Sequence, residues 1–359
     1  MPRPTRDSYA TVVAGAGPAG ILSALHAAER GPVLLAESGP LPRSKSCGGM
    51  LHQLSLDTLH EYGSVPESII VDPRTVNFRY NDWDREITKE TDLAFLNVDR
   101  AGFDEWLLSL LPDNVEIVAR TRVSGFEERD GGLLITLGIE DGTCGVTADL
   151  LIGADGARSS IRRGLGMRQS ASYVTLQDFV QRNGDVDPVF DCIYMRGVGE
   201  FGYSYIIPKG DVALIGSVFY PKTRRPWERQ DAIIASMRER LPQLGASLRR
   251  EASAALCVRS AEDILPGAGR VLLAGEAGGF MSPTSGEGIS YALRTGRLAG
   301  IAAAGEPATA LDRYVDLAET IRQDIVRRLR WLPFMESRAG KYLAGFVPTP
   351  LVSRVTQGL

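Results

Sequence analysis

The sequence predicts an α/β fold in which a Rossmann-like nucleotide-binding domain is interleaved with a β-sheet substrate domain and followed by a helical C-terminal segment. Three observations predict it. The chain opens with a strand, a glycine-rich turn, a helix and a second strand, the order of a βαβ unit. Stretches rich in β-branched and aromatic residues then interrupt the α/β pattern twice. The last part of the chain is helical and partly basic in pattern.

The first unit is the most regular part of the pattern. An apolar strand at 9–14 leads through the glycine turn into a helix at about 18–30 and a strand at 33–37. Further helices are expected at 50–62, 101–111, 229–241 and from about 287, and further strands at 115–126, 132–137, 149–154, within 166–220 and at 270–275. Helical sequence then continues to about residue 345.

The β-rich blocks lie between α/β blocks, so no single linker separates the two domains. We expect the nucleotide-binding domain to comprise residues 1–66, 99–165 and 265–320. The substrate domain would comprise 67–98 and 166–264, and the C-terminal helical segment 321–359.

Composition excludes several classes of protein. The 359 residues carry a formal charge of −4, so no overall positive field favours nucleic acid. The start of the chain lacks the apolar core of a signal peptide, and no stretch is long and apolar enough for a membrane helix. We therefore expect a cytoplasmic protein. The four cysteines form no CxxC pair, and the three histidines have no acid or cysteine at ligand spacing, so we predict no metal.

The glycine turn predicts a dinucleotide site. Its residues are Gly15, Ala16, Gly17, Pro18, Ala19 and Gly20. Glycines let the backbone approach a pyrophosphate at the helix N-terminus, where unpaired N–H groups favour negative charge. Glu37, followed by Ser38, ends the next strand and is placed to accept hydrogen bonds from an adenosine ribose.

Three later motifs occur in a fixed order. "NVDRAGFDEWLL" contains Arg100, "DLLIGADGARSSIRR" places Asp155 and Gly156 after an apolar strand, and "RVLLAGEAGGFMSPTSGEGISYAL" places Glu276 at a strand end. With the glycine turn, these motifs resemble those of the glutathione-reductase-like flavoproteins of the aromatic-hydroxylase branch. The third is most similar to that of the geranylgeranyl reductase group, which shares its fold with flavin-dependent halogenases. The resemblance covers roughly residues 8–320.

The resemblance implies that the cofactor is FAD. It also implies that Arg100 contacts the flavin side and that Val123 offers its backbone to the adenine. The acid of the third motif, Asp in the family and Glu276 here, would bond the ribityl chain. The turn that follows would pass close to the flavin ring through Gly286, Gly288 and Ile289, so that its N–H groups meet the charge on reduced flavin.

Cys47 lies in "RSKSCGGM", between the ribose-binding acid and a predicted helix. A cysteine directly ahead of a helix meets its positive end, which favours thiolate. Family members carry Cys-Gly-Gly at this position, near the flavin, and the block comprises Lys45, Cys47, Gly48, Gly49 and Met50. Three interpretations are open for Cys47: a thiol that donates a proton or orients substrate, a small packing residue, and a thioether to the flavin. Arg43 and Lys45 are candidates for phosphate or substrate contact, or belong to a solvated loop.

The substrate domain contains "YSYIIP", which resembles two family signatures: Tyr-x-Trp-x-Phe-Pro in the reductases and Trp-x-Trp-x-Ile-Pro in the halogenases. Tyrosine stands here in place of tryptophan, so neither activity follows directly from the motif. Alternate residues of a strand share a face, so Tyr203 and Tyr205 would line a pocket together and are candidate catalytic residues. The alternative is ordinary core.

These features predict an FAD-dependent oxidoreductase that reduces a C=C bond of an apolar, isoprenoid-like or conjugated molecule by hydride transfer. The alternatives are a flavin-hydroperoxide monooxygenase or halogenase acting on an aromatic secondary metabolite, and a flavin redox sensor or carrier. NADPH, a flavin reductase or ferredoxin is the expected electron donor. The C-terminal stretch 330–355 is expected to pack over the substrate domain, with contact to a membrane surface or a partner as the alternative.

Overall fold

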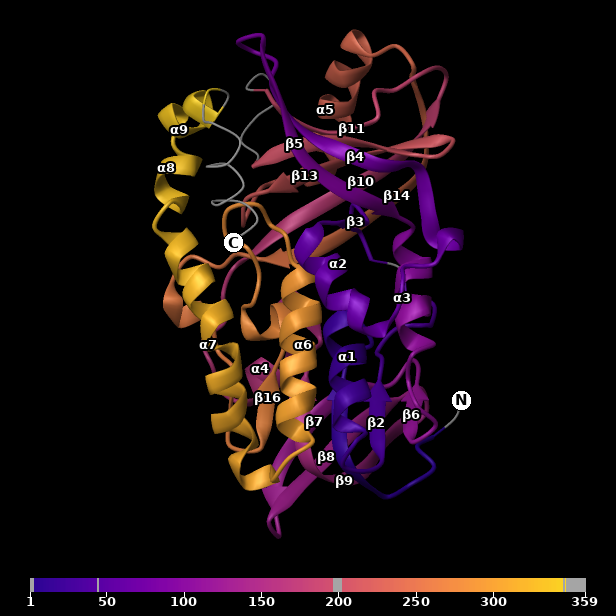
Figure 1. Ribbon diagram of the computed structural model, residues 1–359, viewed down its shortest axis with the longest axis vertical. Helices are drawn as coiled ribbons and strands as arrows, with labels where there is room; N and C mark the ends of the chain where they lie inside the picture. The colour runs from indigo at the N-terminus through magenta and orange to yellow at the C-terminus, as the bar shows by residue number, and fades with distance from the viewer. Residues whose placement is uncertain (1–2, 44, 196–201, 345, 347–359) are drawn as a thin grey trace.

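The computed structural model describes residues 3–43, 45–195, 202–344 and 346. Two sheets lie one above the other along the long axis of the molecule (Figure 1). The lower sheet is largely parallel and flanked by helices, and the upper sheet is curled and largely antiparallel. The predicted α/β fold class is confirmed. The predicted domain limits stay a prediction.

The lower sheet has eight strands in the order β15-β16-β9-β1-β2-β6, extended by β8 and β7 beside β9. Its strands are β1 (Ser8–Ala14), β2 (Val33–Ala36), β6 (Val115–Val118), β7 (Arg122–Arg129), β8 (Gly132–Ile139), β9 (Gly142–Gly153), β15 (Gly267–Ala268) and β16 (Val271–Leu273). Strands β16, β9, β1, β2 and β6 pair in parallel, so their carboxyl ends meet at one edge. Strand β2 is buried along its whole length, as expected for a sheet covered on both faces.

The helices are α1 (Pro18–Ala27), α2 (Gln53–Leu59), α3 (Arg100–Leu108), α4 (Ser160–Gly164), α5 (Pro226–Arg240), α6 (Ile289–Ala303), α7 (Ala310–Leu329), α8 (Leu332–Glu336) and α9 (Arg338–Ala344). Helices α1 and α6 approach each other through glycine. A Cβ on Gly296 would lie 2.2 Å from the carbonyl oxygen of Ala19, and one on Gly300 would lie 2.6 Å from that of Ser23. These contacts show that the two helices run in parallel, so both N-termini point to the same edge of the sheet.

The upper sheet has the order β14-β10-β13-β12-β11-β4-β5-β3. Its strands are β3 (Met50–Leu51), β4 (Ile70–Asp82), β5 (Ile87–Val98), β10 (Ser172–Arg182), β11 (Val189–Tyr194), β12 (Tyr203–Lys209), β13 (Val212–Phe219) and β14 (Leu244–Leu256). Helix α5 covers its outer face, where Ile233 and Met237 pack against Leu176, Ile206 and Ile215. The inner face is turned toward the lower half of the molecule.

One predicted helix begins later than expected. The stretch 50–62 was predicted to be helical throughout, but Met50 and Leu51 form strand β3 and helix α2 begins at Gln53. Met50 and Leu51 pair with Asn97 and Leu96 at the edge of the upper sheet. The edge of β5 offers backbone N–H and C=O groups for pairing, and this pairing outweighs the helical pattern of the two residues. Their predicted helical state is wrong.

Helices α7, α8 and α9 form the C-terminal part of the described chain and run from the lower half up beside the upper sheet (Figure 1). Arg259 and Glu336 form an ion pair at 2.5 Å, and the guanidinium of Arg85 lies 5.2 Å from the ring centre of Tyr342. The predicted packing of this segment over the substrate domain is confirmed for its described part, and residues 347–355 lie outside the described residues.

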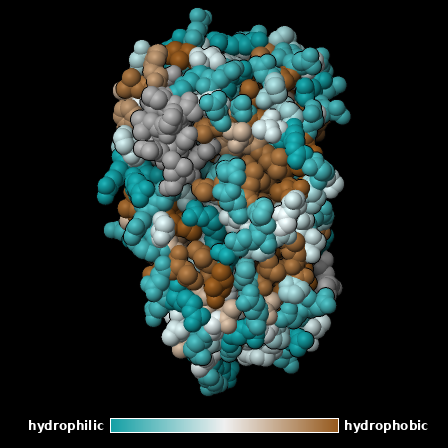
Figure 2. All heavy atoms as spheres, in the orientation of Figure 1, coloured by the Kyte–Doolittle hydropathy of each residue, from teal (hydrophilic) through white to brown (hydrophobic). Residues whose placement is uncertain are grey.

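Large apolar side chains are exposed on α8 and α9 and on the residue before α8, among them Trp331, Phe334 and Leu343. On the face seen in Figure 2, hydrophobic residues also gather across the middle of the molecule, over the helices of the lower half. In the part of the chain that the structure describes, no helix combines the length and apolar character needed to cross a membrane.

Candidate active site

One cavity of about 1060 Å³ extends from the carboxyl ends of the parallel strands to the inner face of the upper sheet. The predicted residues that line it are Gly15, Gly17, Pro18, Ala19, Glu37, Ser38, Lys45, Cys47, Gly48, Met50, Arg100, Val123, Asp155, Gly156, Tyr203, Tyr205, Glu276, Gly286, Gly288 and Ile289. The fold therefore brings together residues from both halves of the molecule around one space.

Gly20 and Gly49 do not line the cavity. A Cβ on Gly20 would lie 1.8 Å from the carbonyl oxygen of Gly15, and one on Gly49 would lie 2.2 Å from that of Val98. Gly49 also has φ +62, in the left-handed region that favours glycine. Both glycines are required by backbone packing beside the cavity.

The glycine turn forms a cradle at the N-terminus of α1. Gly15 has φ +100, and a Cβ there would lie 2.5 Å from the carbonyl oxygen of Ala154. Gly17 caps α1 without a side-chain hydrogen bond, and Pro18 follows as the first helical residue. The first N–H groups of α1 therefore face the cavity end without a capping side chain, as an anion site requires.

Glu37 is held in place by the backbone around it. Its Oε2 accepts from the main-chain N–H of Ala16 at 2.9 Å, and its Oε1 accepts from that of Gly39 at 2.9 Å. Arg43 lies against both the acid and the glycine turn. Its Nε is 3.2 Å from Glu37 Oε2, and one guanidinium nitrogen is 2.6 Å from where a Cβ of Gly17 would lie. Arg43 is thus part of the cradle rather than a solvated loop.

Two buried oxygen atoms that face this end lack a hydrogen-bond partner among the described residues. They are Asp155 Oδ1 and Ser46 Oγ. The other carboxylate oxygen of Asp155 accepts from the main-chain N–H of Ser160 at 2.7 Å, which fixes the side chain. Buried polar atoms are rarely left unpaired, so both atoms indicate a polar ligand. Together with the cradle, they fit a dinucleotide cofactor.

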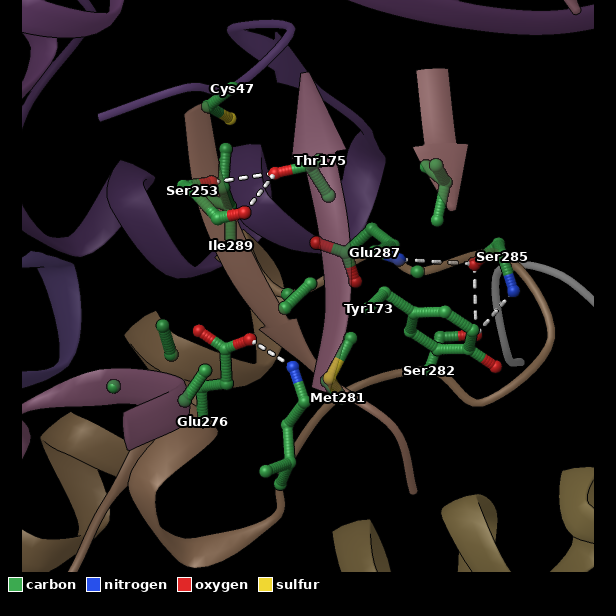
Figure 3. Close-up of a pocket in the computed structure, with 18 of the residues that line it drawn as sticks. Cys47, Tyr173, Thr175, Ser253, Glu276, Met281, Ser282, Ser285, Glu287 and Ile289 are labelled. Carbon is green, nitrogen blue, oxygen red and sulfur yellow. Dashed lines mark hydrogen bonds between the residues drawn. The ribbon is translucent and has the colours of Figure 1, made fainter. Parts of the chain in front are cut away.

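Glu276 ties the two halves together in the middle of the cavity (Figure 3). Its Oε1 accepts from the main-chain N–H of Leu256 at the end of β14, at 2.7 Å, and its Oε2 accepts from Lys45 Nζ at 3.2 Å. The shorter aspartate of the related proteins would fall about one bond short of such a reach. The extra methylene of Glu276 therefore has a structural use in this chain.

The turn before α6 is closed by its own hydrogen bonds. Ser282 Oγ accepts from Ser285, and the N–H of Glu287 donates to Ser285 Oγ at 3.4 Å (Figure 3). Glu287 also accepts from the N–H and the hydroxyl of Ser290, each at 2.7 Å. This network fixes the backbone of Gly286 and Gly288 at the cavity wall.

Sequence reasoning missed the partner of Glu287. His52 Nδ1 accepts from the N–H of Leu54, so its hydrogen lies on Nε2, 3.4 Å from the carboxylate of Glu287. Burial favours the neutral acid, but the adjacent imidazole of His52 and the hydrogen bonds from Ser290 outweigh it and lower the pKa of Glu287. His52 was not among the predicted site residues, and only the Gly-Glu-Gly pattern at a helix start indicated an acid at this position.

Cys47 lies among cationic and phenolic side chains. It contacts Arg100 and lies within electrostatic range of Lys209, Tyr203 and Tyr205. Burial alone would lower the pKa of Arg100, but Asp104 and Cys47 reverse this and raise it. Helix α2 begins six residues after Cys47, so the predicted effect of a helix N-terminus on the thiol does not apply.

Lys209, at the end of β12, was also missed. Its Nζ donates to the carbonyl oxygen of Val98 at 2.9 Å and to that of Gly49 at 3.4 Å. Burial lowers the pKa of Lys209 to about 8. The ammonium group fastens the Gly48–Gly49 loop to the upper sheet and does not point into the open part of the cavity. Its position after "YSYIIP" was the only available signal.

The upper part of the cavity has an aromatic wall, formed by Phe78, Phe95, Phe190, Tyr203 and Tyr205. Phe190 meets Phe78, Phe95 and Tyr205 edge to face, with ring centres 5.5, 5.8 and 5.6 Å apart. Tyr203 and Tyr205 are 6.1 Å apart, so the two predicted tyrosines do line one face of β12.

Two hydrogen bonds fix the tyrosines of the wall. The hydroxyl of Tyr203 donates to the carbonyl oxygen of Ser285 at 3.1 Å, and that of Tyr205 accepts from Gln177 at 2.7 Å. Gly216 leaves room for the Tyr205 ring, because a Cβ there would lie 2.1 Å from it. The aromatic wall therefore begins at the turn before α6. Within the described residues, no group of three or more acidic, histidine or cysteine side chains is arranged to hold a metal ion.

A dinucleotide cradle that opens into an aromatic chamber defines an FAD-dependent oxidoreductase. The chain belongs to the FAD-binding domain family, whose model matches residues 8–329. It is 27% identical to the protein CbrA of Escherichia coli O139:H28 over 297 residues, covering 80% of this chain and 82% of CbrA.

Solved structures share the fold. A geranylgeranyl bacteriochlorophyll reductase-like protein from Thermoplasma acidophilum has a TM-score of 0.79 at 20% identity, covering 98% of this chain and 92% of its own. The flavin-dependent brominase Bmp2 has a TM-score of 0.73 at 18% identity, covering 97% of each chain. The predicted resemblance to the geranylgeranyl reductase-like flavoproteins and the predicted FAD cofactor are confirmed.

Proposed function

We propose that the protein reduces a carbon–carbon double bond of an apolar, isoprenoid-like or conjugated small molecule. When bound, reduced FAD would provide the hydride for one carbon of that bond, and this chain would have to deliver a proton to the other. The observation that carries the proposal is the continuity of the cavity: the aromatic wall begins at Tyr203, whose hydroxyl bonds the turn before α6.

The protein groups that would hold FAD are spread over the lower half. Glu37 would bind the adenosine ribose, and the N-terminus of α1 the pyrophosphate. Asp155 and Glu276 would bind the central part of the cofactor, and the turn at Gly286 and Gly288 would support the ring. Arg43, which shields Glu37 and lies against Gly17, would neutralise phosphate charge.

The aromatic wall suits an apolar chain with π electrons. Its rings meet edge to face and are held by neighbouring strands, so the surface is shaped before substrate arrives. Apolar walls also exclude water, which protects a reduced cofactor and strengthens polar interactions inside the chamber. The wall selects for flat or unsaturated substrates.

Two groups of this chain can deliver the proton. Burial raises the pKa of Tyr203 and of Tyr205, so both phenols stay protonated at neutral pH. Cys47 lies beside them and next to Arg100. We propose that Tyr203 or the thiol of Cys47 gives the proton, and that Gln177 keeps Tyr205 in place through its hydrogen bond.

Monooxygenation or halogenation is the second candidate, favoured by the fold shared with the brominase. By the resemblance, a halogenase needs a catalytic lysine close to the flavin. Here Lys45 pairs with Glu276, and Lys209 donates to main-chain carbonyl oxygens. Neither amine points freely at the chamber, and Lys89, which also lines the cavity, lies on β5, three strands away from Tyr203 on β12 and the turn before α6. No described lysine therefore has the required position, which ranks the reductase first. The size and aromatic lining of the chamber favour an enzyme over a carrier, and NADPH, a flavin reductase or ferredoxin is our proposed electron donor.

The test is anaerobic reduction of the purified protein, followed by flavin reoxidation with geranylgeraniol, with oxygen, and with oxygen plus bromide. We expect geranylgeraniol to reoxidise the flavin and to be recovered with one double bond fewer. Tyr203→Phe and Cys47→Ser, each alone and combined, should slow that step and leave flavin content unchanged. Reoxidation by oxygen alone, or a brominated product, would overturn the reductase proposal.

A further inference from the structure

Lys89 is a charged residue in the aromatic chamber that the proposed chemistry does not use. It lies on β5 and lines the cavity, and its ammonium nitrogen is buried without a hydrogen-bond partner among the described residues. Burial lowers the pKa of Lys89, and no neighbouring carboxylate offsets the effect. An ammonium group in this state costs stability unless something pairs with it.

On the opposite face of β4 and β5, a cation is paired with carboxylates. Arg79, on β4 next to Tyr80, has Asp187, Asp191 and Glu90 within 2.6, 2.8 and 3.8 Å of its guanidinium. Glu90 is the neighbour of Lys89 in sequence, but it points to that outer face. These three carboxylates therefore lie on the outer face, and within the described residues no acidic side chain forms an ion pair with Lys89.

Strand register places Lys89 at one end of a row that crosses the sheet. Lys89 pairs with Tyr80, Tyr80 lies beside Cys192, and Cys192 pairs with Tyr205. All four line the cavity. At the level of Lys89, β5 is the last strand of the sheet, because β3 pairs only with Leu96 and Asn97.

The row sets a distance. Three strand spacings separate β5 from β12, which puts the backbone of Lys89 about 14 Å from that of Tyr205 along the sheet. Tyr205 adjoins Tyr203 and the turn before α6, where the proposed reaction takes place. The ammonium group thus lies at the remote end of the chamber.

We propose that Lys89 is a specificity-determining residue that binds an acidic group, carboxylate or phosphate, at the end of the substrate remote from the reacting double bond. The inference rests on the proposed function for the direction of the substrate in the chamber. The substrate class is then an amphiphile with an apolar unsaturated body and one anionic end. The anionic end supplies the counter-charge that Lys89 lacks among the described residues, and the aromatic wall holds the apolar body.

The test uses the FAD-bound oxidised protein and no turnover. Dodecanoate, dodecyl phosphate and 1-dodecanol share one chain and differ in their end group, and calorimetric titration gives the dissociation constant of each. We expect both anions to bind at least about tenfold more tightly than the alcohol, the value of one desolvated charged contact. Tighter binding of dodecanoate or of dodecyl phosphate than of 1-dodecanol supports the proposal. The anion that binds more tightly identifies the natural end group as carboxylate or phosphate.

Three variants sharpen the test. Lys89→Met should bring the anion-to-alcohol ratio to about one and should raise the melting temperature of the ligand-free protein, because it removes an unpaired buried charge. Lys89→Glu should prefer dodecylammonium over dodecanoate. Lys222→Met is the control, since Lys222 is exposed at a turn outside the cavity and its loss should change neither quantity.

An anion preference that survives in Lys89→Met would overturn the proposal, as would equal binding of dodecanoate and 1-dodecanol by the unaltered protein. These results are independent of the proposed function. If geranylgeraniol is not reduced but the anion preference depends on Lys89, only the assigned reaction fails.

Discussion

Different kinds of groups line the two halves of the cavity, the cofactor half at the lower sheet and the substrate half at the upper sheet. In the cofactor half, main-chain atoms and paired charges dominate, as at the glycine turn and around Glu37. In the substrate half, side chains of alternate residues on neighbouring strands dominate, as in the aromatic wall and the row that ends at Lys89. The first half is built to hold one fixed molecule. The second half can take a different molecule whenever a few side chains change.

The largest expected effect comes from a substitution in the cofactor half alone. Gly15→Ala places a Cβ 2.5 Å from the carbonyl oxygen of Ala154 at φ +100. Strain and overpacking together should cost about 4 kcal/mol and abolish FAD binding. The protein should purify without yellow colour. Gly131→Ala, at φ +79 with open space around it, is the matched control and should keep its flavin. Full FAD occupancy in Gly15→Ala would contradict the cradle.

The attachment of the Gly48–Gly49 loop to the upper sheet by Lys209 can be tested through the pH dependence of stability. The pKa of Lys209 is lowered to about 8 in the folded protein, against an ordinary value of 10.5. The unfolded state therefore binds more protons between these values, and stability rises with pH across the window. Relative to Lys209→Met, the unaltered protein should gain about 3 kcal/mol in free energy of unfolding from pH 8 to pH 10.5. Denaturant unfolding of both proteins measures it, and two parallel pH profiles would exclude a buried Lys209.

Glu276 is shared by both halves, so its variants should affect both. Glu276→Ala removes the acceptor for Leu256 and the partner of Lys45, and we expect FAD affinity to fall by about 2 kcal/mol. Glu276→Asp should keep the flavin. Fluorescence titration of the apoprotein with FAD gives the affinities. Unchanged flavin content in the alanine variant would remove Glu276 from the cofactor site.

Gly216→Ala should disturb the substrate half and leave the cofactor half unchanged. The new Cβ would lie 2.1 Å from the Tyr205 ring and push it from the aromatic wall. We expect a loss of about 2 kcal/mol in stability and at least tenfold slower flavin reoxidation by substrate. Flavin content should stay normal, since Gly216 is not near the cradle. A variant that turns over normally would show that the wall tolerates another position of Tyr205.

The cofactor half could be predicted from the sequence because its residues act close to where they stand in the chain. Gly15 and Glu37 belong to one βαβ unit, so motif and geometry coincide. Lys89 reaches the cavity, and Lys209 reaches the carbonyl oxygens of Val98 and Gly49, only through strand register, which no local pattern encodes. Met50 shows the same limit, because its strand exists only by pairing with Asn97.

The register of β16 has a consequence for how the protein is made. This strand, Val271–Leu273, pairs with β9, which in turn pairs with β1 from the start of the chain. The parallel sheet therefore stays incomplete on the ribosome until most of the chain has been translated. Strands β10–β14 of the upper sheet are synthesised before β16, so they emerge while the lower sheet is still incomplete. FAD binding should thus begin only after β16 has been synthesised, and excess riboflavin during expression should not rescue a chain truncated before β16.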